Sequence, residues 1–135
     1  WRKSDYISLH APSTESTRHL IRKETIARMK PGVALINTSR GQLVDEVALA
    51  EALRKGQVAA AGLDVFEKEP PVGSPILSAP NVLFTPHVAG IDEEGIRQMS
   101  AMACRTVAEL FEGKWPAERI VNAEPLSEWT WKSST

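Results

Sequence analysis

The sequence predicts an α/β domain built on a parallel β-sheet. Four short runs have the apolar character of buried strands: Tyr6–Leu9, Val33–Asn37, Ala60–Val65 and Val82–Thr85. Each run is mostly continuous in apolar residues, which is the pattern of strands that are covered on both faces. Helical patterns separate the first three runs, and such alternation is typical of βαβ units in a parallel sheet.

Start and stop signals indicate the helices between these runs. Lys23–Lys30 is followed by Pro-Gly, and Asp45 is suited to cap a helix that ends near Gly56. Five residues of the segment Glu67–Pro80 are proline or glycine. We therefore expect that segment to be a loop without a helix or a central strand.

The pattern changes after residue 91. Asp92 is the expected cap and Gly113 the expected stop of a long helix. Apolar residues recur between them at intervals of three or four, namely Ile96, Met99, Ala103, Val107 and Leu110. The tail Lys114–Thr135 holds three of the four tryptophans without a clear period. We expect the tail to be extended and partly packed.

Composition restricts the possible partners. The 135 residues are enough for one globular domain, and 16 basic against 17 acidic side chains provide no basic stretch for nucleic acid. The single cysteine, Cys104, excludes an internal disulfide framework, and the Cys/His spacing of a metal site is missing. No apolar stretch approaches the roughly 20 residues that cross a bilayer. We predict a cytoplasmic protein without a membrane or nucleic-acid partner.

Polar side chains follow three of the predicted strands. T-S-R-G comes after the second run, F-E-K-E-P after the third and P-H-V-A-G after the fourth. The carboxyl ends of parallel strands border the crevice where ligands bind in open α/β sheets. We therefore expect Arg40, Glu69 and His87 to converge there.

The chemistry of these three residues is complementary. An arginine grips a carboxylate with two hydrogen bonds. Histidine titrates near neutrality, so it is able to take a proton from a substrate hydroxyl and return it to a carbonyl. A carboxylate beside that histidine fixes its tautomer and favours its protonated form. Together, Arg40, Glu69 and His87 suit the interconversion of a 2-hydroxy acid and a 2-oxo acid.

Each of the three residues also has a plainer interpretation. Arg40 is placed to cap the next helix or to pair with Asp45 or Glu46. Glu69 has the position of an ordinary solvated loop residue, and His87 that of a donor to a backbone carbonyl in its own turn. No single residue decides between these alternatives.

Four longer motifs, taken together, resemble the D-isomer-specific 2-hydroxyacid dehydrogenase family. They are L-H-A-P-S-T-E-S-T-R-H-L-I, M-K-P-G-V-A-L-I-N-T-S-R-G-Q-L-V-D-E, G-L-D-V-F-E-K-E-P and N-V-L-F-T-P-H-V-A-G. The resemblance covers roughly residues 4 to 112, with the motifs in the family's order. Chance agreement of four ordered motifs is remote.

The resemblance implies a role for each matched residue. Arg40 matches the arginine that binds the substrate carboxylate, His87 the acid/base, and Glu69 its carboxylate partner. In related formate dehydrogenases an amide stands at the place of Glu69, so the carboxylate favours hydroxy-acid chemistry. The cofactor is expected to be NAD or NADP, and the residues expected to bind it are Pro12, Thr38, Ser39, Arg40, Asp64, His87 and Gly90. Among these, Asp64 matches a residue near the nicotinamide carboxamide.

The family's glycine-rich G-x-G-x-x-G fingerprint is absent from the 135 residues. The resemblance therefore implies the C-terminal half of a Rossmann-type parallel-sheet NAD-binding domain. Residues 1–90 correspond to the second half of the NAD(P)-binding domain, and residues 91–135 to a helix and tail that return to the substrate domain. We expect the isolated fragment to be inactive, prone to self-association at its uncovered strand edge, and unable to bind cofactor appreciably.

Two functional classes remain open. The first is an NAD(P)-dependent oxidoreductase that acts on a small 2-hydroxy or 2-oxo acid and is a homodimer when full length. The second is a dinucleotide-sensing, corepressor-like binding protein, because such proteins share the fold and keep the same arginine, glutamate and histidine.

Overall fold

The computed structural model of this chain describes residues 1–121. Contacts between residues divide the chain into two compact units, Trp1–Ala89 and Gly90–Thr135. Each unit is described by itself.

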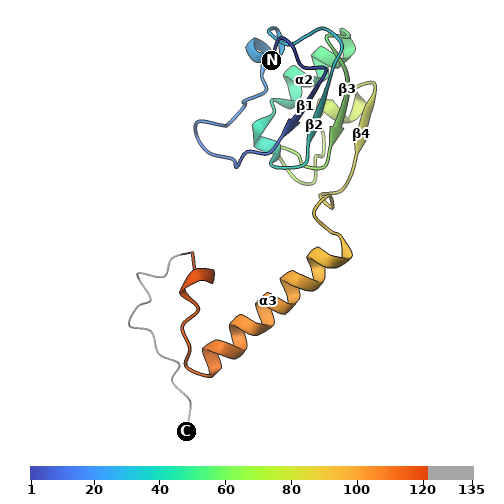
Figure 1. The fold of residues 1–135 in the computed structure, drawn as a ribbon. Coiled ribbons are helices and arrows are strands. Elements are labelled where there is room, and N and C mark those ends of the chain that lie inside the picture. Colours follow the sequence, from blue (N-terminus) through green and yellow to red (C-terminus); the bar gives the residue numbers. More distant parts are fainter. Residues whose placement is uncertain (122–135) are drawn as a thin grey trace. The chain divides into compact units, whose positions relative to one another are not determined.

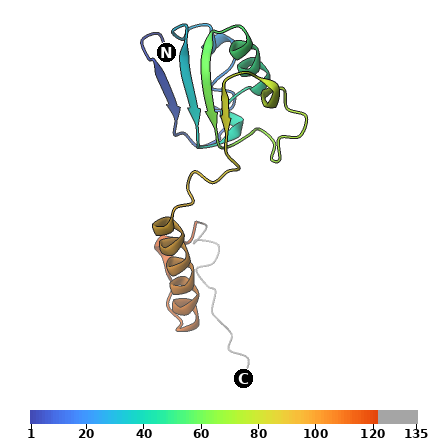
Figure 2. The ribbon, with the colours of Figure 1, turned by 90° about the vertical axis from the view of Figure 1, so that its right-hand side faces the viewer.

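The first unit is built on a four-stranded parallel sheet in the order β1-β2-β3-β4 (Figure 1). The strands are β1 (Tyr6–Leu9), β2 (Val33–Asn37), β3 (Val58–Leu63) and β4 (Val82–Phe84). Their last residues lie side by side, since Leu9 pairs with Asn37, Asn37 with Leu63, and Leu63 with Phe84. All four strands therefore end at one edge, and in Figure 2 their arrows point the same way.

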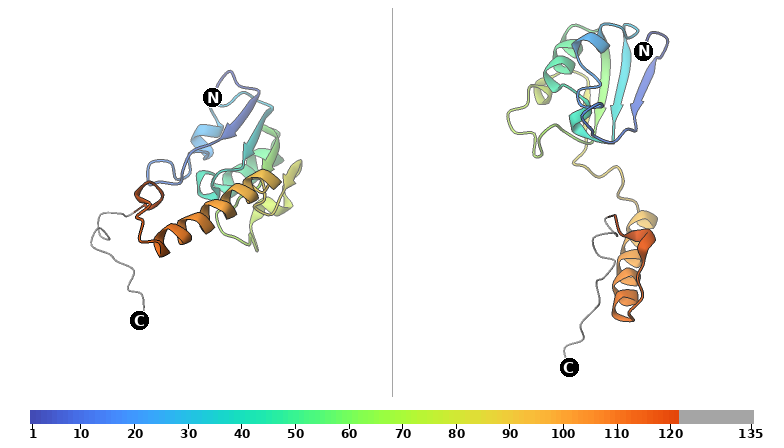
Figure 3. Two further views of the ribbon diagram at one scale, coloured as in Figure 1. Left: turned by 60° about the horizontal axis from the view of Figure 1, so that its bottom comes forward. Right: turned by 90° about the vertical axis from the view of Figure 1, so that its left-hand side faces the viewer.

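Helices α1 (Lys23–Ile26) and α2 (Glu46–Arg54) lie on the same side of the sheet (Figures 2 and 3). Ile7 and Leu9 of β1 are buried, while Tyr6 and Ser8 face away from the helices and are exposed. Cover on both faces, which the continuous apolar runs predict, is therefore not found within residues 1–89. The reason is that both α-helices of this unit pack on one face.

The core lies between that face and the two helices. Its largest fully buried apolar side chains come from the sheet, from α2 and from the segments that join them: Ile21, Val33, Leu35, Leu43, Leu49, Val58 and Ile76. This layer fixes the sheet against α2, so the loops at the carboxyl edge start from a rigid base.

Helix α2 follows its sequence signals. The Asp45 carboxylate accepts a hydrogen bond from the Ala48 N–H at 2.9 Å, and Gly56 adopts a positive φ of 72° after the last turn. A left-handed residue at this place is the usual helix stop, and glycine adopts it without strain. The predicted cap and stop are confirmed.

Four predictions of secondary structure are wrong in detail. The fourth strand ends at Phe84 instead of Thr85. The first helix ends at Ile26 instead of Lys30, because the N–H groups of Arg28 and Met29 bond to carbonyls three residues back and the chain turns. The third strand spans Val58–Leu63 instead of residues 60–65, since its pairing with β2 ends at Leu63. The proline-rich loop contains a short 3₁₀ helix, η2 (Pro75–Ser78).

The second unit contains one long helix, α3 (Glu93–Phe111). The Asp92 carboxylate accepts from the Gly95 N–H at 2.9 Å, and Gly113 has a φ of 73°, so the predicted cap and stop are confirmed. A 3₁₀ turn, η3 (Ala117–Arg119), follows. Of the predicted tail, residues 122–135 lie outside the described part of the chain. No helix among residues 1–121 combines the length and the apolar character needed to cross a membrane.

Candidate active site

A cavity of about 180 Å³ opens at the carboxyl edge of the sheet. Three segments that are distant in sequence line it: the 3₁₀ turn η1 (Gly41–Leu43) with the residue before it, the loop after β3, and the turn after β4. The lining residues are Arg40, Gly41, Gln42, Val65, Phe66, Glu67, Glu69 and His87. The three residues expected to converge therefore lie around one cavity.

His87 is paired with Glu69. The distance from His87 Nδ1 to Glu69 Oε2 is 2.8 Å, and Glu69 Oε1 accepts from the Phe66 N–H at 3.1 Å. The hydrogen bond from His87, followed by that from Phe66, lowers the pKa of the Glu69 carboxyl below its ordinary value. Since Glu69 occupies Nδ1, the imidazole presents Nε2 to a ligand. Glu69 is therefore not simply a solvated loop residue, and His87 Nδ1 bonds to a side chain instead of a backbone carbonyl in its own turn.

Asp64 holds the turn that carries His87. Its side chain is only 2% exposed and accepts from the Thr85 hydroxyl at 2.6 Å, the Val88 N–H at 2.8 Å and the Ala89 N–H at 3.0 Å. Burial alone raises the pKa of Asp64, but these hydrogen bonds outweigh it, so the pKa lies below its usual value. The ionised carboxylate thus binds the Thr85 side chain before His87 and the backbone after it, and His87 itself has a φ of 58°.

Asn37 holds the turn that carries Arg40. This side chain is fully buried at the end of β2. Its Oδ1 accepts from the N–H of Ser39 at 3.1 Å and from the Ser39 hydroxyl at 3.0 Å, and its Nδ2 donates to the Arg40 carbonyl at 2.9 Å. The residue order N-T-S-R thereby closes a compact turn that presents Arg40 at the sheet edge.

The Arg40 side chain is exposed and donates from Nη1 to the Ser39 carbonyl at 2.6 Å. Within residues 1–121 it forms no ion pair with Asp45 or Glu46. Those two carboxylates bind the Ala48 and Glu67 N–H groups instead. The interpretation of Arg40 as a partner of these acids is therefore wrong. Arg40 does stand at the N-cap position of η1, where its carbonyl accepts from the Leu43 N–H at 3.2 Å, but its side chain makes no cap hydrogen bond.

Gly41 allows the turn that carries Arg40 to pack closely against the backbone of Phe66 and Glu67. A Cβ atom placed on Gly41 lies 1.9 Å from both the carbonyl carbon and the oxygen of Phe66 and 2.6 Å from the Glu67 nitrogen. Only a residue without a side chain permits that approach. The distance between the Arg40 turn and the loop that carries Glu69 therefore depends on this glycine.

The other residues expected to bind cofactor lie on separate segments. Pro12 is exposed in the loop after β1, and its carbonyl accepts from the Thr17 hydroxyl at 2.7 Å. Thr38 is exposed directly after β2, while Ser39 is half-buried. These segments follow neighbouring strands at the same edge. Gly90 belongs to the second unit and is not placed against them.

Asn37 and Gly41 shape the walls of the cavity but were not predicted from the sequence as site residues. The available signals were a polar residue at the end of the apolar run V-A-L-I-N and a glycine directly after Arg40. Each signal is a single residue. The role of Gly41 becomes clear only from the loop with Phe66 and Glu67, which packs against it in the fold.

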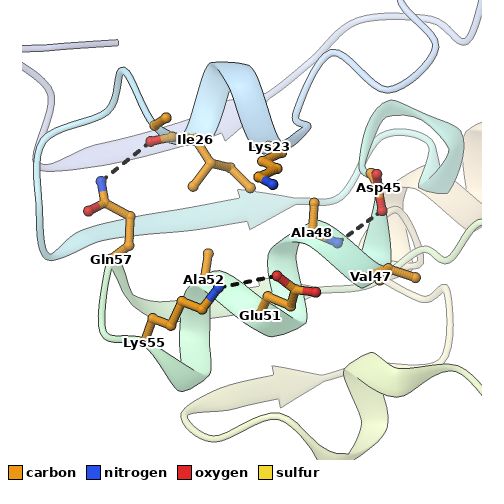
Figure 4. Close-up of a pocket in the computed structure, with 10 residues that line it drawn as sticks. Lys23, Ile26, Asp45, Val47, Ala48, Glu51, Ala52, Lys55 and Gln57 are labelled. Carbon is orange, nitrogen blue, oxygen red and sulfur yellow. Dashed lines mark hydrogen bonds and ion pairs between the residues drawn. The ribbon is translucent and has the colours of Figure 1, made fainter.

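A larger cavity of about 480 Å³ lies between α1 and α2 (Figure 4). It shares no lining residue with the cavity at the carboxyl edge. Several of its polar groups bind one another, since Lys55 pairs with Glu51 at 3.3 Å and Gln57 donates to the Ile26 carbonyl at 3.4 Å. This cavity is a groove between helices and lacks the acid/base pair of the carboxyl edge.

Residues 1–89 match the family model described as the NAD binding domain of D-isomer specific 2-hydroxyacid dehydrogenases. This chain belongs to that family. Its parallel sheet agrees with the Rossmann-type NAD-binding domain of the D-2-hydroxyacid dehydrogenases, so the predicted α/β fold is confirmed.

Three similar proteins illustrate the range of the D-2-hydroxyacid dehydrogenase family. A D-3-phosphoglycerate dehydrogenase of Methanocaldococcus jannaschii is 42% identical over 121 residues, which cover 90% of this chain and 23% of the relative. A hydroxypyruvate reductase of Thermotoga maritima is 51% identical over 102 residues, or 73% of this chain and 33% of the relative. The NAD-complexed D-isomer specific 2-hydroxyacid dehydrogenase of Lactobacillus delbrueckii ssp. bulgaricus superposes with a TM-score of 0.77 at 33% identity, covering 87% of this chain and 40% of that structure. The chain thus spans less than half the length of each of these three proteins.

Proposed function

We propose that the full-length protein containing this chain is an NAD(P)-dependent oxidoreductase that interconverts a D-2-hydroxy acid and the corresponding 2-oxo acid. The observation that carries the proposal is the 2.8 Å contact between His87 Nδ1 and Glu69 Oε2 beside Arg40, at one cavity of the sheet's carboxyl edge. A proton carrier and a carboxylate-binding group within one small site are the two requirements of this chemistry.

Each of the three side chains has one role. The Arg40 guanidinium binds the substrate carboxylate through paired hydrogen bonds and thereby orients C2. His87 Nε2 takes the hydroxyl proton during oxidation and returns it to the oxygen of the 2-oxo acid during reduction. Glu69 holds Nδ1, fixes the tautomer and stabilises the positive charge on the imidazolium. Its lowered pKa supports a carboxylate that stays ionised at neutral pH.

The residues at this edge fit the nicotinamide end of the cofactor. Exposed Thr38 offers a hydroxyl after β2, and the Ser39 hydroxyl, which donates to Asn37, keeps its capacity to accept a hydrogen bond. The turn after β4 is held by Asp64. When bound, a nicotinamide cofactor accepts or supplies the hydride at substrate C2. We propose that the residues which bind it are Pro12, Thr38, Ser39, Arg40, Asp64, His87 and Gly90.

We further propose that residues 1–90 form the second half of the NAD(P)-binding domain and residues 91–135 the return to the substrate domain. The division of the chain after Ala89 supports this assignment. Since the glycine-rich fingerprint is not among the 135 residues, the isolated chain is expected to be inactive. The full-length enzyme is proposed to be a cytoplasmic homodimer, and free Cys104 suits a reducing compartment.

Steady-state turnover by the full-length protein tests the proposal. The substrates are glyoxylate, hydroxypyruvate, pyruvate and 3-phosphohydroxypyruvate, each with NADH and with NADPH. We expect saturable reduction of at least one 2-oxo acid. Binding of the dinucleotide without turnover of any of the four would favour the corepressor-like alternative.

A further inference from the structure

Three polar or charged side chains are buried among the described residues: Asn37, Glu46 and Asp64. Asn37 binds the turn that carries Arg40, and Asp64 binds the turn that carries His87. A buried polar group is costly unless its hydrogen bonds are satisfied, so each such residue needs a structural reason. The third, Glu46, is not explained by the roles proposed so far.

Glu46 lies in the first turn of α2 and is 6% exposed. Its Oε1 accepts from the Glu67 N–H at 2.7 Å, and its Oε2 accepts a short hydrogen bond from the Ser74 hydroxyl. Glu67 and Ser74 flank Glu69 in the loop between β3 and η2. One buried carboxylate therefore holds this loop, on both sides of Glu69, against a helix that is fixed in the core.

Glu67 is also held from the opposite side. Gln42 Nε2 donates to the Glu67 carbonyl at 3.3 Å, and His19 Nε2 contacts the Glu67 carboxylate. Glu67, two residues before Glu69, is thus fixed at its N–H by Glu46 of α2, at its carbonyl by Gln42 of η1 and at its carboxylate by His19. By contrast, the backbone hydrogen bonds from the Val72 N–H to the Pro70 carbonyl and from the Ser74 N–H to the Pro71 carbonyl are local to the loop.

We propose that Glu46 is a positioning residue for the acid/base pair. It acts by holding the loop in which Glu69 reaches His87, as Asn37 holds the Arg40 turn and Asp64 holds the His87 turn. The inference rests on the proposed function, because the effect of Glu46 on turnover passes through Glu69. Each of the three candidate catalytic residues then has one buried polar side chain that fixes its backbone.

A double-mutant cycle in the full-length protein tests this role. Glu46→Ala is expected to lower kcat/KM about 10-fold, since the loop loses both of its hydrogen bonds to Glu46 and a displacement of about 1 Å costs up to 100-fold. The same change in a Glu69→Gln background is expected to cost less than about 2-fold, because the pair it positions is already impaired. In the single variant, the alkaline limb of the pH profile for reduction should move in the direction produced by Glu69→Gln.

Glu46→Gln is the matched rescue variant. Its amide oxygen accepts from the Glu67 N–H and its amide nitrogen donates to the Ser74 hydroxyl, so kcat/KM should stay within about 2-fold of wild type. If Glu46→Ala does not fold, Glu46→Leu takes its place in the cycle, since leucine fills a similar volume without a hydrogen-bond acceptor. An unchanged kcat/KM in the folded Ala or Leu variant, or an equal loss with and without Glu69, would overturn the inference. Failure of the wild-type protein to turn over any 2-oxo acid would instead overturn the proposed function.

Discussion

Replacing Gly41 with alanine is expected to separate the two loops that face the cavity. The added Cβ lies 1.9 Å from the carbonyl carbon and oxygen of Phe66, about 1.5 Å short of the 3.4 Å at which ordinary contacts begin. The neighbouring atoms are backbone, so no side-chain rotation relieves the overlap. The Arg40 turn and the Glu69 loop must therefore move apart by an ångström or more.

Two effects of that displacement are measurable in the full-length protein. Overpacking of a buried site costs about 1–3 kcal/mol of unfolding free energy. A displacement of about 1 Å between catalytic groups costs up to 100-fold in rate, so we expect kcat/KM to fall about 100-fold. Thermal unfolding measures the first effect, and steady-state kinetics well below the melting temperature measure the second.

Leu53→Ala provides the control. Leu53 is buried in α2, away from the carboxyl edge, and its truncation is expected to cost about 2–5 kcal/mol while kcat/KM of the folded protein stays near wild type. A Gly41→Ala protein with wild-type kcat/KM, or an equal kinetic loss in Leu53→Ala, would show that the spacing of the two loops does not govern activity.

The remaining predictions concern single side chains of the full-length protein. His87→Ala should lower kcat about 100-fold or more with a modest change in KM, and an unchanged kcat would remove it from the acid/base role. Glu69→Gln keeps a hydrogen-bonding side chain but removes the charge that stabilises a protonated imidazole, so the alkaline limb of the pH–rate profile for reduction should move to lower pH. Arg40→Lys loses the bidentate grip, worth about 1.5–3 kcal/mol, and should raise KM for the oxo acid about 10- to 100-fold; equal KM values would argue against a substrate contact. Asp64 has a pKa below its ordinary 3.8 in the folded protein, so the unfolded state binds more protons just below that pH, and stability should fall as pH drops through this range. Asp64→Asn should lose stability at neutral pH and flatten this acid dependence, and acid titrations followed by circular dichroism would measure both.

Much of the sheet was predictable from the sequence because its signals are local. The bounds of β1 and β2 agree with the apolar runs Tyr6–Leu9 and Val33–Asn37, and the caps Asp45 and Asp92 act as their residue types predict. The convergence of Arg40, Glu69 and His87 follows from topology, since parallel strands bring their carboxyl ends to one edge.

The sequence did not predict the features that depend on contacts between distant segments of the chain. The first helix stops at Ile26 although its pattern continues to Lys30, because the chain must turn to start β2. Glu46 and Gly41 have no local signal that separates them from an ordinary first-turn glutamate and an ordinary loop glycine. Their roles depend on the loop after β3, which is 20 or more residues away in the chain.

Transfer of a deuterium label tests the central claim most directly. The full-length protein is supplied with NADH or NADPH that carries deuterium at the transferable C4 position, together with the 2-oxo acid that it accepts, and the product is examined by mass spectrometry and NMR. We predict deuterium at C2 of the 2-hydroxy acid, with the D configuration for substrates such as pyruvate or hydroxypyruvate, and formation that is about 100-fold or more slower in His87→Ala. Product without the label at C2, or transfer at an unchanged rate in His87→Ala, would contradict it.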